Sequence, residues 1–292
     1  MKGESRLLAV LGSPIAHSKS PVLHRAAYEA LGLPWRYEAI EVSTDELPEF
    51  IGSRTPEWRG LSLTMPLKRD VLPLLDTRHE LVELTGAANT VLFHDNAGDR
   101  TLKGFNTDVF GITAALLGAG IGRVSAVRVL GAGATAASAI VAVAQLGAGR
   151  VAVSARTPER MAGLVSLGER LGVEVRSADV RGADVGAHTA GFDRGFVPDA
   201  VISTMPGGAE HDLRFDEATR ASSVLLDVAY DPWPSQLALS WLEAGGRVAS
   251  GLDMLLNQAL MQVRIFVAGS PAFELPNEPK VLAAMRVAVA LD

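Results

Sequence analysis

One stretch of the chain, residues 127–160, constrains the fold more than any other. A short apolar run stops at Gly131-Ala-Gly133-Ala-Thr-Ala136, helix-favouring residues follow as far as Leu146, and a second apolar run ends at Ser154. Strand, glycine turn, helix and strand in this order make a βαβ unit with a G-x-G-x-x-A turn at its first crossover. The stretch therefore predicts a Rossmann-type unit built on a parallel sheet.

The glycine turn favours nucleotide binding over a purely structural crossover. Gly131 and Gly133 lack a Cβ, so the backbone can turn sharply and approach a pyrophosphate closely. The helix N-terminus behind them offers unpaired N–H groups and a partial positive charge to that anion. We predict that a dinucleotide binds along the turn, at Gly131, Ala132, Gly133 and Ala134.

The residues after the second strand bear on the choice of cofactor. NAD-binding units carry an Asp or Glu there to hold the ribose 2′-hydroxyl, whereas Ser154-Ala155-Arg156-Thr157 contains no carboxylate. Arg160 follows one helical turn later. Guanidinium groups bind phosphate by charge-assisted, bidentate hydrogen bonds. The sequence favours NADP over NAD, with Arg156, Thr157 and Arg160 at the 2′-phosphate; the alternative is that these arginines are solvated residues at a helix start.

Composition excludes several classes of function. The net charge of −6 comes without a basic block, so nucleic acid is an unexpected partner. The chain has no Cys, which removes disulfides and thiolate sites, and its six His residues show no metal-ligand spacing. No apolar stretch is long enough to span a membrane, and residues 1–6 are polar rather than leader-like. We expect a cytoplasmic protein without a metal site.

The order of predicted elements indicates an α/β fold with two domains. Strands and helices alternate throughout, which favours parallel sheets. Helices predicted at 254–267 and 280–290 are too apolar to stand alone, so we expect them to return to the first domain. The predicted boundaries are 1–108 for the first part of a substrate domain, 109–248 for an inserted Rossmann domain, and 249–292 for the returning helices.

Four polar clusters interrupt strand ends or helix starts in the first domain. They are Ser18 with Ser20, Thr64 with Lys68, Asn89-Thr90, and Asn106-Thr107-Asp108. Ligands bind at the carboxyl ends of strands in open α/β sheets. Taken singly, each residue also has a structural explanation: Ser20 as the N-cap of a helix, for example, or Lys68 as surface charge opening a helix that runs to Leu75. Together, hydroxyls, amides, one Lys and one Asp suit a small polyhydroxylated acid.

The polar clusters lie in motifs that resemble a known family. Gly12-Ser-Pro-Ile-Ala-His-Ser18-Lys-Ser20-Pro21 is similar to the N-terminal signature of shikimate dehydrogenases, G-x-P-I-x-H-S-x-S-P. The resemblance continues in the family's order over nearly the whole chain, through Leu63-Thr64-Met-Pro66-Leu-Lys68, Gly86-Ala-Ala-Asn89-Thr90, Gly104-Phe-Asn106-Thr107-Asp108, the glycine turn, Tyr230-Asp-Pro232 and Gly251-Leu-Asp-Met254-Leu255-Leu-Asn-Gln258-Ala259.

The resemblance implies an activity and a set of roles. The family interconverts 3-dehydroshikimate and shikimate with NADP, a step of chorismate and aromatic amino-acid biosynthesis, and acts as a monomer or homodimer. Lys68 and Asp108 would be the catalytic pair. The substrate would be bound by Ser18, Ser20, Thr64, Asn89, Tyr230 and Gln258, and the nicotinamide end of the cofactor would lie near Gly251 and Met254.

Some positions depart from the family pattern. Ala155 stands where the family usually has an Asn, which removes one expected adenosine contact. The segment Ser203-Thr-Met-Pro-Gly207 replaces the usual Asn-Ala-Thr-Ser. Two alternatives therefore stay open: a quinate or dual quinate/shikimate dehydrogenase, and a catalytically silent nucleotide-binding regulator on the same fold. The paired serines, Ser18 and Ser20, and the arginines 156 and 160 favour shikimate as substrate and NADP as cofactor over the quinate alternative. The intact Lys68 and Asp108 argue against a silent protein.

Overall fold

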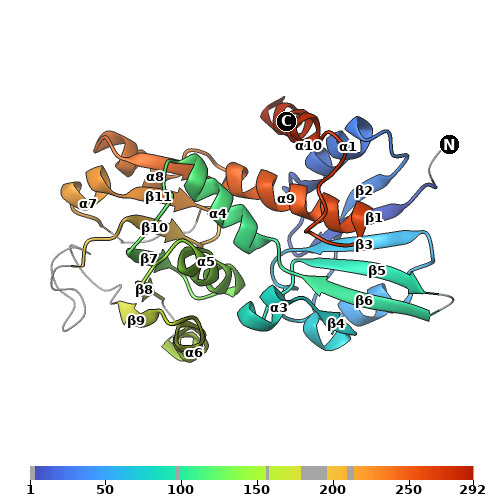
Figure 1. The fold of residues 1–292 in the computed structure, drawn as a ribbon, viewed down its shortest axis with the longest axis horizontal. Coiled ribbons are helices and arrows are strands. Elements are labelled where there is room, and N and C mark those ends of the chain that lie inside the picture. Colours follow the sequence, from blue (N-terminus) through green and yellow to red (C-terminus); the bar gives the residue numbers. More distant parts are fainter. Residues whose placement is uncertain (1–3, 97–98, 156–157, 179–195, 209–213, 292) are drawn as a thin grey trace. The chain divides into compact units, whose positions relative to one another are not determined.

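The computed structural model describes residues 4–96, 99–155, 158–178, 196–208 and 214–291 (Figure 1). Its backbone contacts divide the chain into two compact units. Unit 1 comprises Met1–Thr107 and Leu255–Asp292, and unit 2 comprises Asp108–Met254. Each unit has its own sheet and helices, so the predicted α/β class is confirmed. Within the described residues, no helix has the length and apolar character needed to cross a membrane.

The sheet of unit 1 has six strands in the order β2-β1-β3-β5-β6-β4. The strands are β1 Leu7–Gly12, β2 Arg36–Glu41, β3 Trp58–Leu63, β4 Thr77–Arg78, β5 Thr90–Asn96 and β6 Asp99–Phe105. β1 is parallel to β2 and β3, but β5 is antiparallel to β3 and β6. The expectation of a parallel sheet is therefore wrong for β5. The link between β5 and β6 is too short for the crossover that parallel strands need.

One edge of this sheet gathers several strand ends. The register pairs Leu11 with Leu63 and Ser62 with Thr90. It also pairs Thr90 with Phe105. Side by side at this edge therefore lie the ends of β1, β3 and β6 and the start of β5. The segments next to these strand ends carry the predicted polar clusters.

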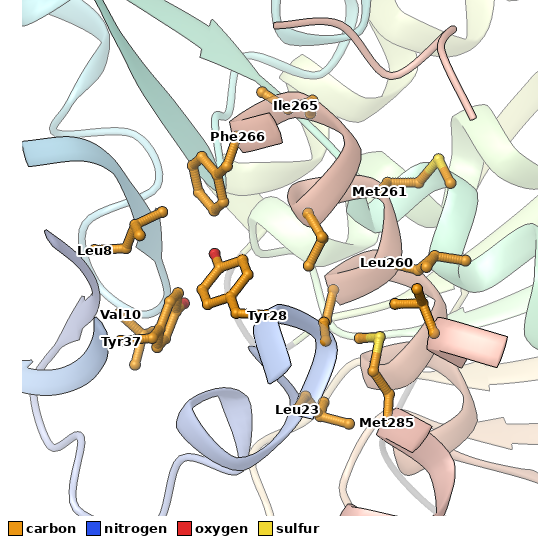
Figure 2. Close-up of a cluster of buried hydrophobic side chains, with 14 of the residues drawn as sticks. Leu8, Val10, Leu23, Tyr28, Tyr37, Leu260, Met261, Ile265, Phe266 and Met285 are labelled. Atoms are coloured by element: carbon orange, nitrogen blue, oxygen red, sulfur yellow. The ribbon is translucent and has the colours of Figure 1, made fainter. Parts of the chain in front are cut away.

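Helices cover both faces of the sheet of unit 1. They are α1 Ser20–Ala30, α2 Leu47–Gly52, α3 Glu80–Thr85, α9 Gly251–Ala268 and α10 Glu278–Leu291. Alternate residues of β1 face opposite sides, as the period of a strand requires. Leu8 and Val10 pack with α1, α9 and α10 in the cluster of Figure 2. Ala9 and Leu11 pack into a second cluster. The predicted return of the C-terminal helices to the first domain is confirmed, and α10 lies beside α1 (Figure 1).

Unit 2 contains a six-stranded parallel sheet in the order β12-β11-β10-β7-β8-β9. This is the strand order of dinucleotide-binding folds, so the predicted Rossmann-type domain is confirmed. Its strands are β7 Ala126–Leu130, β8 Arg150–Ser154, β9 Glu174–Ala178, β10 Ala200–Ser203, β11 Val224–Asp227 and β12 Arg247–Ser250. Its helices are α4 Asp108–Gly118, α5 Ala134–Gln145, η2 Pro158–Arg160, α6 Met161–Leu171, α7 Glu217–Ser222 and α8 Gln236–Glu243.

Two local predictions are wrong. The helix expected from Lys68 to Leu75 is a series of turns with one 3-10 helix, η1 Leu72–Leu74. Pro73 explains this, because inside an α-helix it would lack a donor and its ring would clash with the carbonyl four residues earlier. Ser20 is not the N-cap of α1 but its first residue; Lys19 holds the cap position, without a side-chain cap bond.

Candidate active site

Backbone hydrogen bonds fix the segment that carries Thr64 and Lys68 at the gathered edge of the sheet of unit 1. On one side, the Thr64 N–H donates to the Leu11 carbonyl at 2.9 Å, and the Ser13 N–H donates to the Met65 carbonyl at 3.1 Å. On the other side, the Ala88 N–H donates to the Lys68 carbonyl at 2.8 Å. Residues 64–68 therefore lie between the end of β1 and the segment that leads to Asn89.

Gly12 allows this close approach. A Cβ at Gly12 would come within 2.9 Å of the Met65 carbonyl oxygen and would also collide with the Thr64 methyl group. The absence of a side chain at the end of β1 therefore lets residues 64–65 lie against that strand.

Ser18 and Ser20 lie between the end of β1 and the first turn of α1. The Ser18 N–H donates to the Ile15 carbonyl at 3.0 Å, and the Ser18 hydroxyl accepts from the Ser20 N–H at 3.3 Å. Ser18 is half-buried and Ser20 is buried. The two serines thus belong to one compact turn that starts from the same strand end as residues 12–13.

Asn89 is the centre of a buried amide and hydroxyl cluster. Its Nδ2 donates to Thr107 Oγ1 at 2.9 Å and to Gln258 Oε1 at 3.2 Å. Its Oδ1 accepts from the Thr107 N–H at 2.9 Å and from the Thr90 hydroxyl at 2.8 Å. The structure therefore brings together Asn89 and Gln258, two predicted site residues that are far apart in sequence.

Lys68 and Asp108 both adjoin this cluster through their neighbours in the chain. Lys68 is half-buried, and its carbonyl binds the N–H of Ala88, the residue before Asn89. Asp108 is the first residue of α4 and directly follows Thr107, which binds Asn89. In the part of the chain that the structure describes, no group of His, Asp and Glu side chains could hold a metal ion.

The glycine turn of unit 2 has the geometry of an anion site. Gly131 adopts φ 106°, a left-handed conformation, and a Cβ there would lie 2.5 Å from Thr204 Oγ1. Gly133 is the N-cap of α5 without a side-chain cap bond, and a Cβ on it would meet no atom of the described residues within 4 Å. The start of α5 therefore has no side-chain cap and leaves room at Gly133, features that suit a bound pyrophosphate.

The other predicted site residues of unit 2, the cofactor residues and Tyr230 of the substrate set, lie after strand ends or in η2. Gly251 begins α9, and a Cβ on it would collide with the Val228 carbonyl. Met254 lies in the first turn of the same helix, Tyr230 lies after β11, and Arg160 ends η2 as an exposed residue. Arg156 and Thr157 lie outside the described residues, so the predicted 2′-phosphate contacts remain a prediction.

Comparison with known proteins identifies the family. Residues 10–91 match the shikimate dehydrogenase substrate binding domain. A shikimate dehydrogenase (NADP(+)) of Geobacter sp. (strain M21) is 36% identical over 92% of this chain and 92% of its own length. The chain belongs to the shikimate dehydrogenase family.

Solved structures of the family share the fold of this chain. Mycobacterium tuberculosis shikimate dehydrogenase matches with a TM-score of 0.79 and 38% identity, covering 98% of this chain and 100% of that one. The Thermus thermophilus shikimate 5-dehydrogenase in complex with NADP(H) and shikimate matches with a TM-score of 0.75 and 28% identity, covering 97% and 99%. The pentafunctional AROM polypeptide of Malassezia globosa is 33% identical over 96% of this chain, and the match covers 18% of that polypeptide.

The departures from the shikimate dehydrogenase pattern lie around the glycine turn. The Thr204 N–H and hydroxyl both donate to the Leu130 carbonyl at 2.8 Å, so the segment that replaces Asn-Ala-Thr-Ser packs directly against this turn. Ala155 is half-buried directly after β8.

One buried polar residue close to the site was missed by the sequence analysis. Gln262 lies one helical turn after Gln258 on α9, and its Nε2 donates to the Asn89 carbonyl at 3.2 Å. A glutamine four residues after a predicted substrate-binding residue, on the same face of a helix, is the signal that could have found it.

Proposed function

We propose that this chain is an NADP-dependent oxidoreductase that interconverts shikimate and 3-dehydroshikimate by hydride transfer, in the pathway to chorismate and the aromatic amino acids. The observation that carries the proposal is the amide and hydroxyl cluster centred on Asn89 at one edge of the sheet of unit 1, in a chain of this family. A substrate with several ring hydroxyls and a carboxylate needs such a set of fixed donors and acceptors.

The substrate roles are those that the resemblance to shikimate dehydrogenases implies. The hydroxyls of Ser18 and Ser20 would bind the carboxylate, and Thr64, Asn89 and Gln258 would bind ring hydroxyls, with Tyr230 near the same ligand. Asn89, Thr90 and Thr107 are joined to one another by hydrogen bonds, so this wall of the site is rigid before the substrate arrives.

Lys68 and Asp108 would manage the single proton of the reaction. NADP, when bound, supplies the hydride chemistry. The oxidation of shikimate breaks one C–H and one O–H bond, releasing a hydride to the cofactor and a proton from the alcohol oxygen. A Lys beside an Asp can hold that proton and stabilise the developing charge on oxygen, and the reverse direction returns the proton to the same oxygen.

The cofactor would be held by unit 2. The turn formed by Gly131, Ala132, Gly133 and Ala134 would bind the pyrophosphate, since Gly133 leaves the start of α5 open. Arg156, Thr157 and Arg160 would bind the adenosine 2′-phosphate, and Gly251 and Met254 would lie near the nicotinamide. We further propose that the protein acts in the cytoplasm as a monomer or homodimer, which cell fractionation and sedimentation velocity would measure.

Absorbance of reduced nicotinamide tests the proposal in a matrix of four reactions: shikimate or quinate with NADP⁺ or NAD⁺. We expect rapid turnover only with shikimate and NADP⁺. Comparable rates with quinate or with NAD⁺ would instead indicate a catabolic quinate or dual-specificity dehydrogenase. The absence of turnover in all four reactions would overturn the proposal in favour of a silent nucleotide-binding protein.

A further inference from the structure

A buried chain of hydrogen bonds leads from the core of unit 1 to Asn89. Thr90 in the wall of the site belongs to this chain, and its members beyond the site are Gln262, Ser62, His24, Tyr28 and Tyr37; all are buried. Tyr28 and Tyr37 belong to the hydrophobic cluster of Figure 2. The His24 ring stacks on the Tyr37 ring with centroids 3.9 Å apart and planes 8° from parallel.

Gln262 is the junction of this chain. Its Nε2 donates to the Asn89 carbonyl at 3.2 Å and to Thr90 Oγ1 at 3.1 Å. Its Oε1 accepts from the Ser62 hydroxyl at 2.9 Å and lies 3.1 Å from His24 Nε2. A carboxamide has two N–H donors and two acceptor lone pairs, so these four contacts use its full hydrogen-bonding capacity.

The donor and acceptor of each hydrogen bond follow from groups that can only accept or only donate. The Asn89 carbonyl can only accept, so the side of Gln262 that faces it must be Nε2. Oε1 therefore faces His24, whose Nε2 must carry the proton while Nδ1 accepts from the Tyr28 hydroxyl at 3.1 Å. Burial lowers the pKa of His24 to about 3, so the ring is neutral and keeps this tautomer at neutral pH.

The same reasoning fixes the orientation of Asn89. Thr90 Oγ1 accepts from Gln262, so its own proton goes to Asn89 Oδ1, at 2.8 Å. The Thr107 N–H, which can only donate, also binds Asn89 Oδ1. Nδ2 of Asn89 is therefore turned to the other side, toward Gln258 and the Thr107 hydroxyl.

We infer that Gln262 is a positioning residue, which holds the Asn89 backbone directly and its carboxamide through Thr90, so that the Nδ2 donor of Asn89 stays turned toward Gln258 and Thr107, where a substrate hydroxyl would take the place of one of these two acceptors. The inference rests on the proposed function, because Asn89 is assigned there to the ring hydroxyls. Gln262 is itself only 2% exposed and acts through Asn89, without touching the substrate.

Steady-state kinetics of three variants separates positioning from a merely structural role. Gln262→Leu removes the junction, and Thr90→Val removes the link to Asn89 Oδ1 while keeping the shape of the side chain. Tyr37→Phe is the matched control: it removes one buried hydrogen bond of the same network, the 2.7 Å bond to Ser62, and none to Asn89 or Thr90. All three variants are expected to lower the Tm.

We expect Gln262→Leu and Thr90→Val to raise the KM for shikimate about tenfold and to leave the KM for NADP⁺ within about twofold of the wild-type value. Tyr37→Phe should leave both KM values within about twofold. The inference is overturned if the KM for shikimate is the same in Gln262→Leu, Thr90→Val and the control Tyr37→Phe. If Gln262→Leu does not fold, Thr90→Val decides the question.

A second measurement keeps the inference separate from the proposed function. A wild-type protein that does not oxidise shikimate would overturn the proposed function, and the side-chain ¹⁵N–¹H signals of Asn89 would then test the inference alone. These signals are assigned by their loss in Asn89→Asp. We expect them to shift in Thr90→Val and Gln262→Leu but not in Tyr37→Phe, and unchanged signals in the first two variants would contradict the inference.

Discussion

Asn89 illustrates how a single side chain at the edge of a sheet becomes a rigid part of a site. Its carboxamide accepts from a backbone N–H and a hydroxyl on one side and donates to a hydroxyl and an amide on the other. A residue held in this way loses little conformational entropy when a ligand binds. The site is therefore organised in the absence of substrate.

His24 gives a prediction for the pH dependence of stability. Desolvation by burial lowers the pKa of His24 from 6.5 to about 3, although the hydrogen bond with Gln262 acts to raise it. Between these values the unfolded chain binds a proton that the folded chain does not. The contribution of His24 is therefore fully present above pH 6.5 and decreases as the pH falls toward 3.

Urea unfolding of the wild type and His24→Phe at pH 7, 6 and 5 measures this effect. We expect the advantage of the wild type in free energy of unfolding to decrease by up to about 1.4 kcal/mol per pH unit below about pH 6.5. An advantage that stays constant from pH 7 to pH 5 would show that His24 does not remain neutral in the folded state.

The residues proposed for the site could be named from the sequence where a motif carries them, but not where their position depends on the tertiary structure. Ser18, Thr64, Lys68 and Asn89 lie in motifs with a recognisable spacing. The role of Gln262 depends on the pairing of Ser62 with Thr90 and on the face of α9 that packs on these strands. Neither is specified by local sequence, so the network was not foreseen.

At the scale of elements, the glycine turn between β7 and α5 offers two matched substitutions. Gly131 has φ 106° and a Cβ on it would collide with Thr204, whereas Gly133 has φ −88° and open space around it. Gly131→Ala should therefore cost about 1–3 kcal/mol of stability. Gly133→Ala should change stability by less than about 0.5 kcal/mol.

The two variants should also differ in how they affect the cofactor. A methyl group at Gly133 would occupy space at the N-cap of α5 that the proposed pyrophosphate needs, so we expect the KM for NADP⁺ to rise about tenfold in a stably folded protein. Thermal unfolding and steady-state kinetics measure the two effects separately. A Gly133→Ala protein with the wild-type KM for NADP⁺ would show that the pyrophosphate does not bind at this turn.

Helices and strands were predicted well where the apolar periodicity is strong, and poorly where a single residue determines the local structure. The βαβ unit is correct, with α5 starting at Ala134 rather than Ala136. The helix at 68–75 fails because Pro73 outweighs the apolar pattern around it. The two-residue strand β4 exists only through its pairing with β6, which no local pattern indicates.

At the scale of the whole molecule, the chain consists of two units with separate cores; most residues proposed for the substrate lie in unit 1, and those proposed for the cofactor lie in unit 2. Hydrogen exchange with one ligand at a time measures this division. Shikimate alone should protect peptides that cover residues 62–68, 88–90 and 255–262, and NADP⁺ alone should protect those that cover 131–136. Protection of the same peptides by either ligand alone would contradict the assignment.

The overall organisation was predictable from motifs that extend over most of the chain, because their order gives the α/β alternation and the inserted unit. The expectation of parallel sheets missed the antiparallel strand of the first sheet, although the short link between the two predicted strands could have indicated it. β5 is antiparallel because of its short connection to β6, and this pairing places Asn89 and Thr107 next to each other.

We propose that the polar groups at the edge of the sheet of unit 1 bind the substrate for the reaction and that Lys68 handles the proton. The most direct test is the rate of NADP⁺ reduction at saturating shikimate for Lys68→Met, together with shikimate affinity by calorimetry. We predict a kcat lower by about 100-fold or more, with a Kd for shikimate within about threefold of the wild-type value. Turnover close to that of the wild type would show that Lys68 does not handle the proton and would contradict its proposed catalytic role.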